Sequence, residues 1–162
     1  MQDPAAKISQ AVEKGLPQPE GPARSKPNER EAVLKGVGSI RNGPAVLNLY
    51  MEICARCGTC AEQCPVYYGA PEKRFNPVDR SDLIRALYRK RSTIAGRLFG
   101  PLAGARDYTE GEIGEWIERF YECTGCRRCA TFCPFGIDNS VITRKGRAIV
   151  HSLGLPPQRL ID

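Results

Sequence analysis

The chain has 162 residues, of which 41% are hydrophobic and 26% charged, with a formal net charge of +6; this suits one small globular domain with appendages. No run of about 18 apolar residues occurs, so we expect no membrane span, and the N-terminus lacks the apolar core and cleavage site of a secretory signal. We therefore expect a cytoplasmic protein, in which eight cysteines indicate metal ligands rather than disulfides.

Residues 1–44 are predicted to be an extended or disordered arm. From Gly15 to Pro44 the chain is rich in proline, glycine and charge, with few large apolar residues. Such a composition does not bury enough apolar surface to form a core, although residues 7–14 could form one or two helical turns. We expect this arm to become ordered only against a partner, and we assign residues 156–162 to a C-terminal tail.

Residues 45–155 are predicted to form one helical domain. Residues 45–53 are apolar and lead into the first cysteine; their spacing does not separate helix from strand, and we favour a helix. The pair Asn76-Pro77 is a typical helix start. The apolar side chains that follow it at helical spacing are Leu83, Ile84, Leu87 and Tyr88.

Two more helices are predicted beyond residues 92–106, where glycines and prolines break the helical pattern. In residues 110–121 the apolar side chains at helical spacing are Ile113, Trp116, Ile117 and Phe120. In residues 138–152 and just beyond, inward side chains are predicted at Val141, Ile142, Ala148, Ile149 and Leu153. We expect Trp116 in the core and His151, the single histidine, at the surface.

All eight cysteines fall in two copies of one motif. The first copy is Cys54-Ala-Arg-Cys57-Gly-Thr-Cys60-Ala-Glu-Gln-Cys64-Pro65, and the second is Cys123-Thr-Gly-Cys126-Arg-Arg-Cys129-Ala-Thr-Phe-Cys133-Pro134. Both fit the pattern C-x2-C-x2-C-x3-C-P and so resemble the [4Fe–4S] motif of bacterial two-cluster ferredoxins, in which the fourth cysteine ligates the other cluster. Gly58 and Gly125 allow the backbone to bend tightly beside the sulfur atoms.

The motifs therefore predict two [4Fe–4S] clusters with exchanged fourth ligands. The ligands assigned to the first cluster are Cys54, Cys57, Cys60 and Cys133. Those assigned to the second cluster are Cys123, Cys126, Cys129 and Cys64. The exchange ties the two motifs together and places the clusters close enough for electron transfer. Because every cysteine is a ligand, no thiol remains for covalent catalysis, and we expect no catalytic residue.

Zinc and disulfides are the alternatives to iron–sulfur clusters. A zinc site usually pairs two C-x2-C knuckles. Zinc leaves unexplained the third cysteine at the same step, the fourth cysteine, the proline after it and the repeat of the whole motif. Disulfides are rare in the cytoplasm. We therefore favour clusters over both alternatives.

Charge is unevenly distributed between the motifs. Residues 85–106 contain no acidic residue but six cations, namely Arg85, Arg89, Lys90, Arg91, Arg97 and Arg106. Three interpretations remain open: a solvated basic loop, cations that offset the charge of the clusters, or a docking surface for a membrane or a protein of the membrane. The acidic run in residues 107–122 is interpreted as a solvated helix face. No helix-turn-helix or aromatic-basic strand pattern occurs, so we expect no nucleic-acid partner.

The separation of the motifs resembles that in α-helical ferredoxins. Residues 65–122 are too many for a compact β-rich bacterial ferredoxin, and they are predicted to be helical. A similar arrangement is found in the iron–sulfur subunit of succinate dehydrogenase, the C subunit of anaerobic glycerol-3-phosphate dehydrogenase, and the C and D subunits of heterodisulfide reductase. Asn76-Pro77 resembles the start of the helix between the motifs in this family. The run Cys133-Pro-Phe-Gly-Ile-Asp is similar to the N-terminal part of DsrK, from a membrane complex of dissimilatory sulfur metabolism.

The resemblance implies an electron-relay subunit of a heterodisulfide-reductase-like or DsrK-like membrane-associated redox complex. The implied partners are a CCG-domain disulfide reductase subunit and a flavoprotein or membrane cytochrome b subunit. DsrK and the D subunit of heterodisulfide reductase continue into CCG domains, which this sequence does not contain. The chain is thus either similar to the C subunit or a truncated piece, and we expect it to relay electrons without performing the two-electron disulfide step.

Two other functions stay open: a free ferredoxin-like carrier, and a relay subunit of a quinone-linked dehydrogenase. The expected location is the cytoplasm. The basic segment, residues 85–106, leaves open a peripheral position at the inner face of the membrane.

Overall fold

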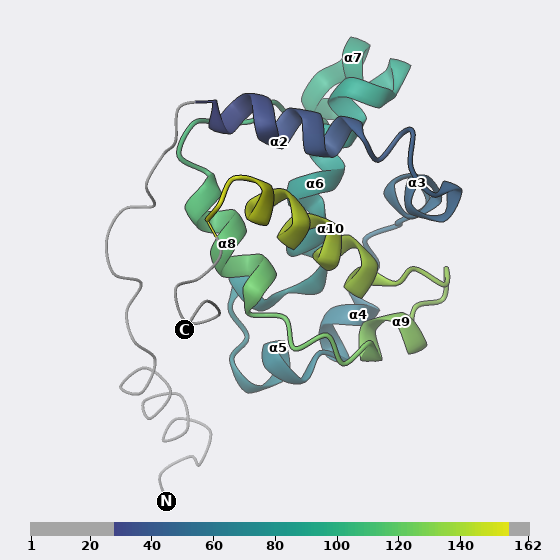
Figure 1. Ribbon diagram of the computed structural model, residues 1–162. Helices are drawn as coiled ribbons and strands as arrows, with labels where there is room; N and C mark the ends of the chain where they lie inside the picture. The colour runs from purple at the N-terminus through teal and green to yellow at the C-terminus, as the bar shows by residue number, and fades with distance from the viewer. Residues whose placement is uncertain (1–27, 156–162) are drawn as a thin grey trace, which may run out of the picture.

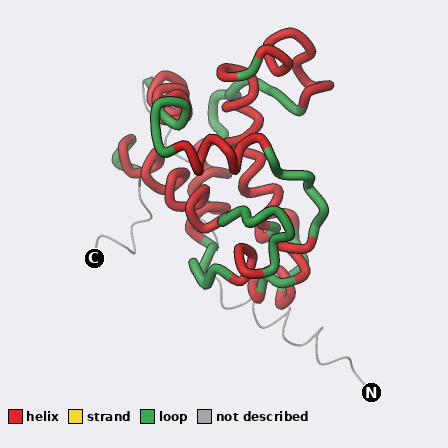
Figure 2. The backbone as a smooth tube through the Cα atoms, turned by 90° about the vertical axis from the view of Figure 1, so that its right-hand side faces the viewer, coloured by secondary structure: helices red, strands yellow, loops and turns green. Residues whose placement is uncertain are grey.

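Helices make up all of the regular structure in residues 28–155, the part of the chain that the computed structural model describes. Figure 2 shows helices joined by loops and no strand in these residues. This arrangement confirms the prediction of a mainly α fold. Within the same residues, no helix combines the length and apolar character needed to cross a bilayer.

The helices differ widely in length, from a single turn to four. In chain order they are α2 (Glu29–Gly38), α3 (Ala45–Glu52), α4 (Thr59–Glu62), α5 (Pro65–Gly69), α6 (Pro77–Ser92), α7 (Ile94–Phe99), α8 (Ile113–Tyr121), α9 (Arg128–Thr131) and α10 (Asn139–Ser152), with 3-10 turns η1 (Lys73–Phe75) and η2 (Gly100–Ala103). The short helices α4 and α9 lie within the two cysteine motifs and contact each other. Figure 1 shows them, together with α5, at the opposite end of the molecule from α7.

The helix α2 corrects the prediction for the N-terminal arm. It packs against α6 and α10. Val33, Val37 and Ile40 are buried in the core, and their i, i+4, i+7 spacing places them on one side of the chain. The prediction of an extended arm is therefore wrong for residues 28–44. The remainder of the predicted arm and the C-terminal tail lie outside the described residues.

Two features hold α2 in place. The hydroxyl of Tyr108 donates a hydrogen bond to the carboxylate of Glu29, and both side chains are buried. Burial, reinforced by this hydrogen bond, raises the pKa of Tyr108 far above its usual value. At Gly36 a Cβ atom would lie 2.6 Å from Ile149 Cγ1, so the absence of a side chain lets α2 approach α10 closely.

The central helix α6 begins where the sequence predicts. Asn76 Oδ1 accepts a hydrogen bond from the Val78 amide at 2.9 Å, and Pro77 occupies the first helical position. The four predicted inward side chains are all buried: Leu83, Ile84, Leu87 and Tyr88. The hydroxyl of Tyr88 also donates to Asn48 Oδ1 at 2.9 Å, which links α6 to α3.

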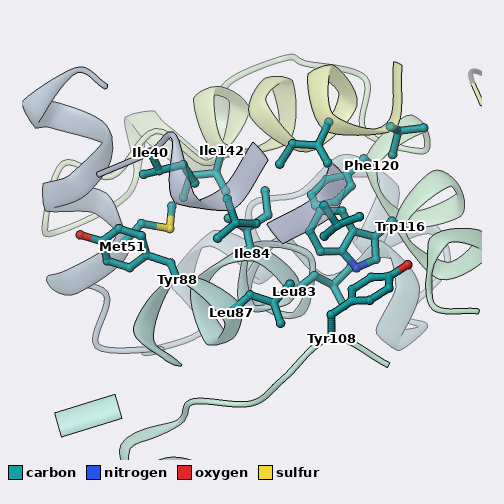
Figure 3. Packing of buried hydrophobic residues seen from close by; sticks show 14 of the residues in the cluster. Ile40, Met51, Leu83, Ile84, Leu87, Tyr88, Tyr108, Trp116, Phe120 and Ile142 are labelled. Atoms are coloured by element: carbon teal, nitrogen blue, oxygen red, sulfur yellow. The ribbon is translucent and has the colours of Figure 1, made fainter. Parts of the chain in front are cut away.

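An aromatic group joins α8 to the rest of the core. The rings of Trp116 and Phe120 meet edge to face with centroids 5.4 Å apart, and Tyr108 meets Trp116 at 6.3 Å. Figure 3 shows these three rings at one end of the core, with Ile40 and Met51 at the other. Phe120 also reaches α10, where a Cβ at Gly146 would lie 2.6 Å from three of its ring atoms.

The predicted helices after residue 110 are confirmed with small changes. α8 and α10 begin at Ile113 and Asn139. Trp116 is buried and His151 is exposed, as predicted. The prediction that Ala148 points inward is wrong, because that residue is exposed and Val150 is buried instead.

The acidic run in residues 107–122 is more than a solvated face. Glu118 accepts a hydrogen bond from Arg74 at 2.8 Å, and Glu112 forms an ion pair with Arg106. Burial raises the pKa of Glu122 to about 7, against the opposing charge of Arg74. Several of these acids therefore link α8 to neighbouring segments.

Gly146→Ala should destabilise the fold. Its new Cβ would overlap the Phe120 ring, and overpacking of this kind costs about 1–3 kcal/mol. The measurement is chemical unfolding of the cluster-loaded protein. Gly38→Ala is the matched control, because a Cβ at that position would meet no atom within 4 Å and alanine favours a helix. Equal stability of the two variants would show that α8 and α10 do not need this close approach.

Candidate metal centre

The two cysteine loops have left-handed backbone at the same two motif positions. In the first motif, Arg56 has φ 54° and Gly58 has φ 87°. In the second, Gly125 has φ 72° and Arg127 has φ 63°. The third and fifth positions of each motif are therefore left-handed, with glycine and arginine in exchanged order. Each loop then enters a helix of four residues, α4 or α9.

This conformation suits a bound anionic group. Left-handed residues in a tight loop turn neighbouring amide N–H groups to one side, which favours a concave site for anions such as iron–sulfur clusters. The amide of Gly125 donates to Cys123 Sγ at 3.4 Å, and Cys57 Sγ lies 3.5 Å from Thr59 Oγ1. The loops thus supply hydrogen-bond donors to sulfur as well as thiol ligands.

A pocket brings together cysteines from both motifs. Its lining contains Cys54, Cys57 and Cys60 of the first motif and Cys133 of the second. The contact between α4 and α9 brings the two loops side by side. The four cysteines predicted to ligate the first cluster therefore line one pocket. Cys64, the fourth cysteine of the first motif, precedes α5 and is half-buried.

Electrostatics show which thiols are close together. Burial, followed by the charges of Cys54, Cys133 and Cys57, raises the pKa of Cys60 to about 11. Burial, followed by Cys123 and Cys60, raises the pKa of Cys129 to about 12. Thiolates in such groups repel one another, so they require a positive partner before they all lose their protons. Iron supplies that charge, and the donor set fits it.

The described residues contain no group of side chains arranged around a single ion. Within residues 28–155, no three or more Cys, His, Asp or Glu side chains lie close enough together to hold one ion. A structural zinc needs four ligands within about 2.3 Å of one centre. A four-iron cluster is larger, because each thiolate binds a different iron and the sulfur atoms stand further apart.

Each loop is held by an arginine–aspartate pair. Arg56 Nε lies 2.8 Å from Asp82 Oδ2 of α6, and Arg127 Nη2 lies 2.9 Å from Asp138 Oδ2 before α10. The arginine in each pair is the left-handed residue of its loop. The pairs therefore fix both loops, in equivalent ways, to long helices of the core.

Asp82 and Asp138 each make a second interaction. Asp82 also pairs with Arg85, whose side chain is 0% exposed and whose Nε and Nη2 have no other hydrogen-bond partner. Asp138 caps α10, where its Oδ1 accepts from the Ser140 amide at 2.8 Å. Burial alone would raise the pKa of Asp138, but the hydrogen bonds from Ser140 and the charge of Arg127 outweigh it and hold the pKa below its usual value.

None of these four supporting residues was predicted from the sequence as part of the site. A signal was present in the motifs themselves. The third and fifth positions read Arg-Gly in the first copy and Gly-Arg in the second. Since glycine marks left-handed backbone, the repeat predicts the same conformation at the arginines Arg56 and Arg127. Their partners Asp82 and Asp138 required the fold.

Comparison with known proteins agrees with this geometry. The family model described as a 4Fe-4S dicluster domain matches residues 50–137. The "Hdr-like menaquinol oxidoreductase iron-sulfur subunit" of Archaeoglobus profundus is 38% identical over 128 residues, covering 79% of this chain and 23% of that protein. Its counterpart in Archaeoglobus fulgidus, numbered 2 in its name, is 39% identical with the same coverage.

A more distant relative is found in methanogens. The D subunit of the dihydromethanophenazine:CoB--CoM heterodisulfide reductase of Methanosarcina mazei is 30% identical over 118 residues, covering 72% of this chain and 28% of that protein. The chain thus spans about a quarter of the length of the curated relatives it matches. No solved structure gives a significant match.

Asp82→Asn should loosen the first loop selectively. The change removes the carboxylate shared by Arg56 and the buried Arg85, and leaving a buried charge unpaired costs about 3 kcal/mol. We expect the first cluster to be lost faster when the protein is diluted into a chelator. Visible absorption measures the total loss, and electron paramagnetic resonance of the reduced protein shows which cluster is lost.

Asp138→Asn is the paired variant for the second loop, because it releases Arg127. It should make the second cluster the less stable one. If both variants lose the same cluster first, the loops are not fixed independently by their arginine–aspartate pairs.

Proposed function

The chain belongs to the 4Fe-4S dicluster domain family, and on this premise we propose that it relays single electrons within a heterodisulfide-reductase-like or DsrK-like membrane-associated redox complex. The chain binds two [4Fe–4S] clusters, and each bound cluster accepts or releases one electron. The observation that carries the proposal is the pocket shared by three cysteines of the first motif and Cys133 of the second. It links the two centres in one domain.

We assign the cluster ligands as the motif spacing predicts. The first cluster is held by Cys54, Cys57, Cys60 and Cys133, and the second by Cys123, Cys126, Cys129 and Cys64. The common pocket and the effect of Cys133 on the pKa of Cys60 support the first set. The proximity of Cys129 to Cys123 and Cys126 supports three members of the second. Cys64 completes the second set by symmetry of the repeat.

The residues around the cysteines position and shield the clusters. Phe135, Ile137 and Val78 contribute apolar atoms to the lining of the first pocket. The amides of the cysteine loops supply hydrogen bonds to sulfur, and hydrogen bonds of this kind tune the reduction potential. We expect no residue to act on a substrate. The domain holds two one-electron centres near each other, which suits a partner that uses electrons in pairs.

The partners are proposed from the relatives. The names of those proteins refer to menaquinol, dihydromethanophenazine and heterodisulfide. We infer that this domain receives electrons from a membrane cytochrome b subunit or a flavoprotein and passes them to a CCG-type disulfide reductase site. We place it at the inner face of the membrane, as a peripheral component.

The complex tests the proposal directly. Gentle purification of the native protein should yield about eight irons per copy of this domain and stable association with a CCG-type reductase and a membrane protein. A lipid-soluble quinol should then reduce both clusters. Two zinc ions per chain would refute the clusters. Isolation without any partner would favour a free carrier, and a flavoprotein dehydrogenase as the stable partner would favour a quinone-linked dehydrogenase.

Cys133→Ser tests the ligand assignment. Because Cys133 lines the pocket of the first motif, the variant should lose or alter the first cluster and keep the second. Cys64→Ser is the reciprocal variant and should damage the second cluster. The measurement is electron paramagnetic resonance of the reduced proteins with iron analysis. If each serine instead damages the cluster of its own motif, the fourth ligands are not exchanged.

A further inference from the structure

The segment that includes α7 and η2 projects from the body of the molecule. Figure 1 shows it beyond the end of α6, away from the cysteine loops. α7 contacts α6 and η2. Four large apolar side chains on it are exposed: Ile94 84%, Leu98 73%, Phe99 57% and Leu102 92%. We call these four residues the apolar tip.

Local structure turns the apolar side of α7 outward. Gly96 faces α6, where a Cβ atom would lie only 2.1 Å from the carbonyl oxygen of Arg89. Ile94 and Leu98 lie two residues before and after Gly96, which places them on the opposite side of the helix. Thr93 fixes this orientation, since its hydroxyl donates to the Arg89 carbonyl at 2.9 Å and accepts from the Gly96 amide at 2.9 Å.

Backbone hydrogen bonds also order the chain after α7, at residues 100–105. The amide of Ala105 donates to the Gly100 carbonyl at 3.0 Å, and the amide of Gly104 donates to the Pro101 carbonyl at 2.9 Å. Gly104 has φ 66° and lies against the guanidinium of Arg56 in the first cysteine loop, where a Cβ would be 3.2 Å from Nη2. Leu102 is therefore presented by an ordered turn.

Cations surround the base of the apolar tip. Arg91 at the end of α6 and Arg97 in α7 are both exposed, and Arg97 Nε donates to the Arg91 carbonyl at 3.1 Å. Arg41 reaches the same place from the loop after α2, where it donates to the Ser92 carbonyl at 3.5 Å. Residues 83–106 contain no acidic residue. The charged side chains that this segment itself contributes are therefore all positive.

We propose that the apolar tip inserts into the interface of an anionic lipid bilayer, with Arg91 and Arg97 at the level of the phosphates. The partner is chosen by complementarity: a projecting apolar tip with exposed arginines at its base fits acyl chains below anionic headgroups. A protein partner would need a groove lined with acids, and it is the competing outcome of the test. The proposal supplies the membrane contact of the proposed function, and it rests on that function only for its biological setting.

Vesicle binding tests this proposal without electron transfer. The cluster-loaded protein is mixed with phosphatidylcholine vesicles, with or without phosphatidylglycerol, and sedimented. We expect binding only to the anionic vesicles and weaker binding at high salt, because salt screens the cations. Leu98→Ser combined with Leu102→Ser should lower partitioning roughly tenfold or more. Arg91→Gln combined with Arg97→Gln should lower it roughly tenfold.

Matched controls lie elsewhere on the surface. Tyr68→Ser removes an exposed aromatic ring from α5, and Arg144→Gln removes an exposed cation from α10. Both should bind vesicles as the unchanged protein does. The inference is overturned if the unchanged protein does not bind anionic vesicles, or if the tip variants bind them as well as the control variants do. Loss of association with a membrane protein of the complex, without vesicle binding, would assign the tip to a protein partner.

The two proposals fail separately. Absorption of both clusters is recorded in every vesicle sample. A missing cluster counts against the electron relay, while vesicle binding in the same sample can still be interpreted. A protein with both clusters intact that does not bind anionic vesicles counts against the lipid contact alone.

Discussion

Thiols that share a pocket repel one another once they lose their protons, and the contacts around the two cysteine loops hold the thiols together against that repulsion. Burial and neighbouring thiols raise the pKa of Cys60 and of Cys129. An apolar core by itself would push such groups apart or keep them protonated. Here two loops with left-handed backbone at the same motif positions are tied to α6 and to the start of α10 by Arg56–Asp82 and Arg127–Asp138. The helical core holds the cysteine loops in place, and iron supplies the positive charge that offsets the thiolates.

The cysteine motifs and the long helices α6, α8 and α10 could be predicted because their signals are local, whereas the short helices α4, α5 and α9 were not predicted. The steps between the cysteines define the ligand chemistry, and Asn76-Pro77 defines the start of α6. α2 could not be predicted by composition, because its glycines and the prolines on both sides suggested disorder. Its spacing of Val33, Val37 and Ile40 was a helical signal. Gly36, which contributed to that composition, is where α10 packs closely.

The supporting residues of the site needed three-dimensional information. Asp82 lies on α6, far in sequence from both motifs, and nothing in its neighbourhood marks it as the partner of Arg56. The orientation of the basic segment, residues 85–106, also could not be predicted from the sequence. Its charge and apolar residues were visible in the sequence, but the direction in which α7 presents them depends on the contact of Gly96 with the Arg89 carbonyl. A helical pattern alone would place Ile94 and Leu98 toward a core.

The pocket that Cys133 shares with Cys54, Cys57 and Cys60 has a consequence for biosynthesis. The first three of these thiols leave the ribosome long before the fourth. The pocket is complete only when the chain has been synthesised beyond Asn139 and the second loop has docked on the first. The thiols of the first motif therefore leave the ribosome before Cys133 is available to complete the pocket. With the ligand set proposed above, the first cluster would be inserted only after most of the domain has been synthesised, and the early cysteines would need protection from oxidation until then.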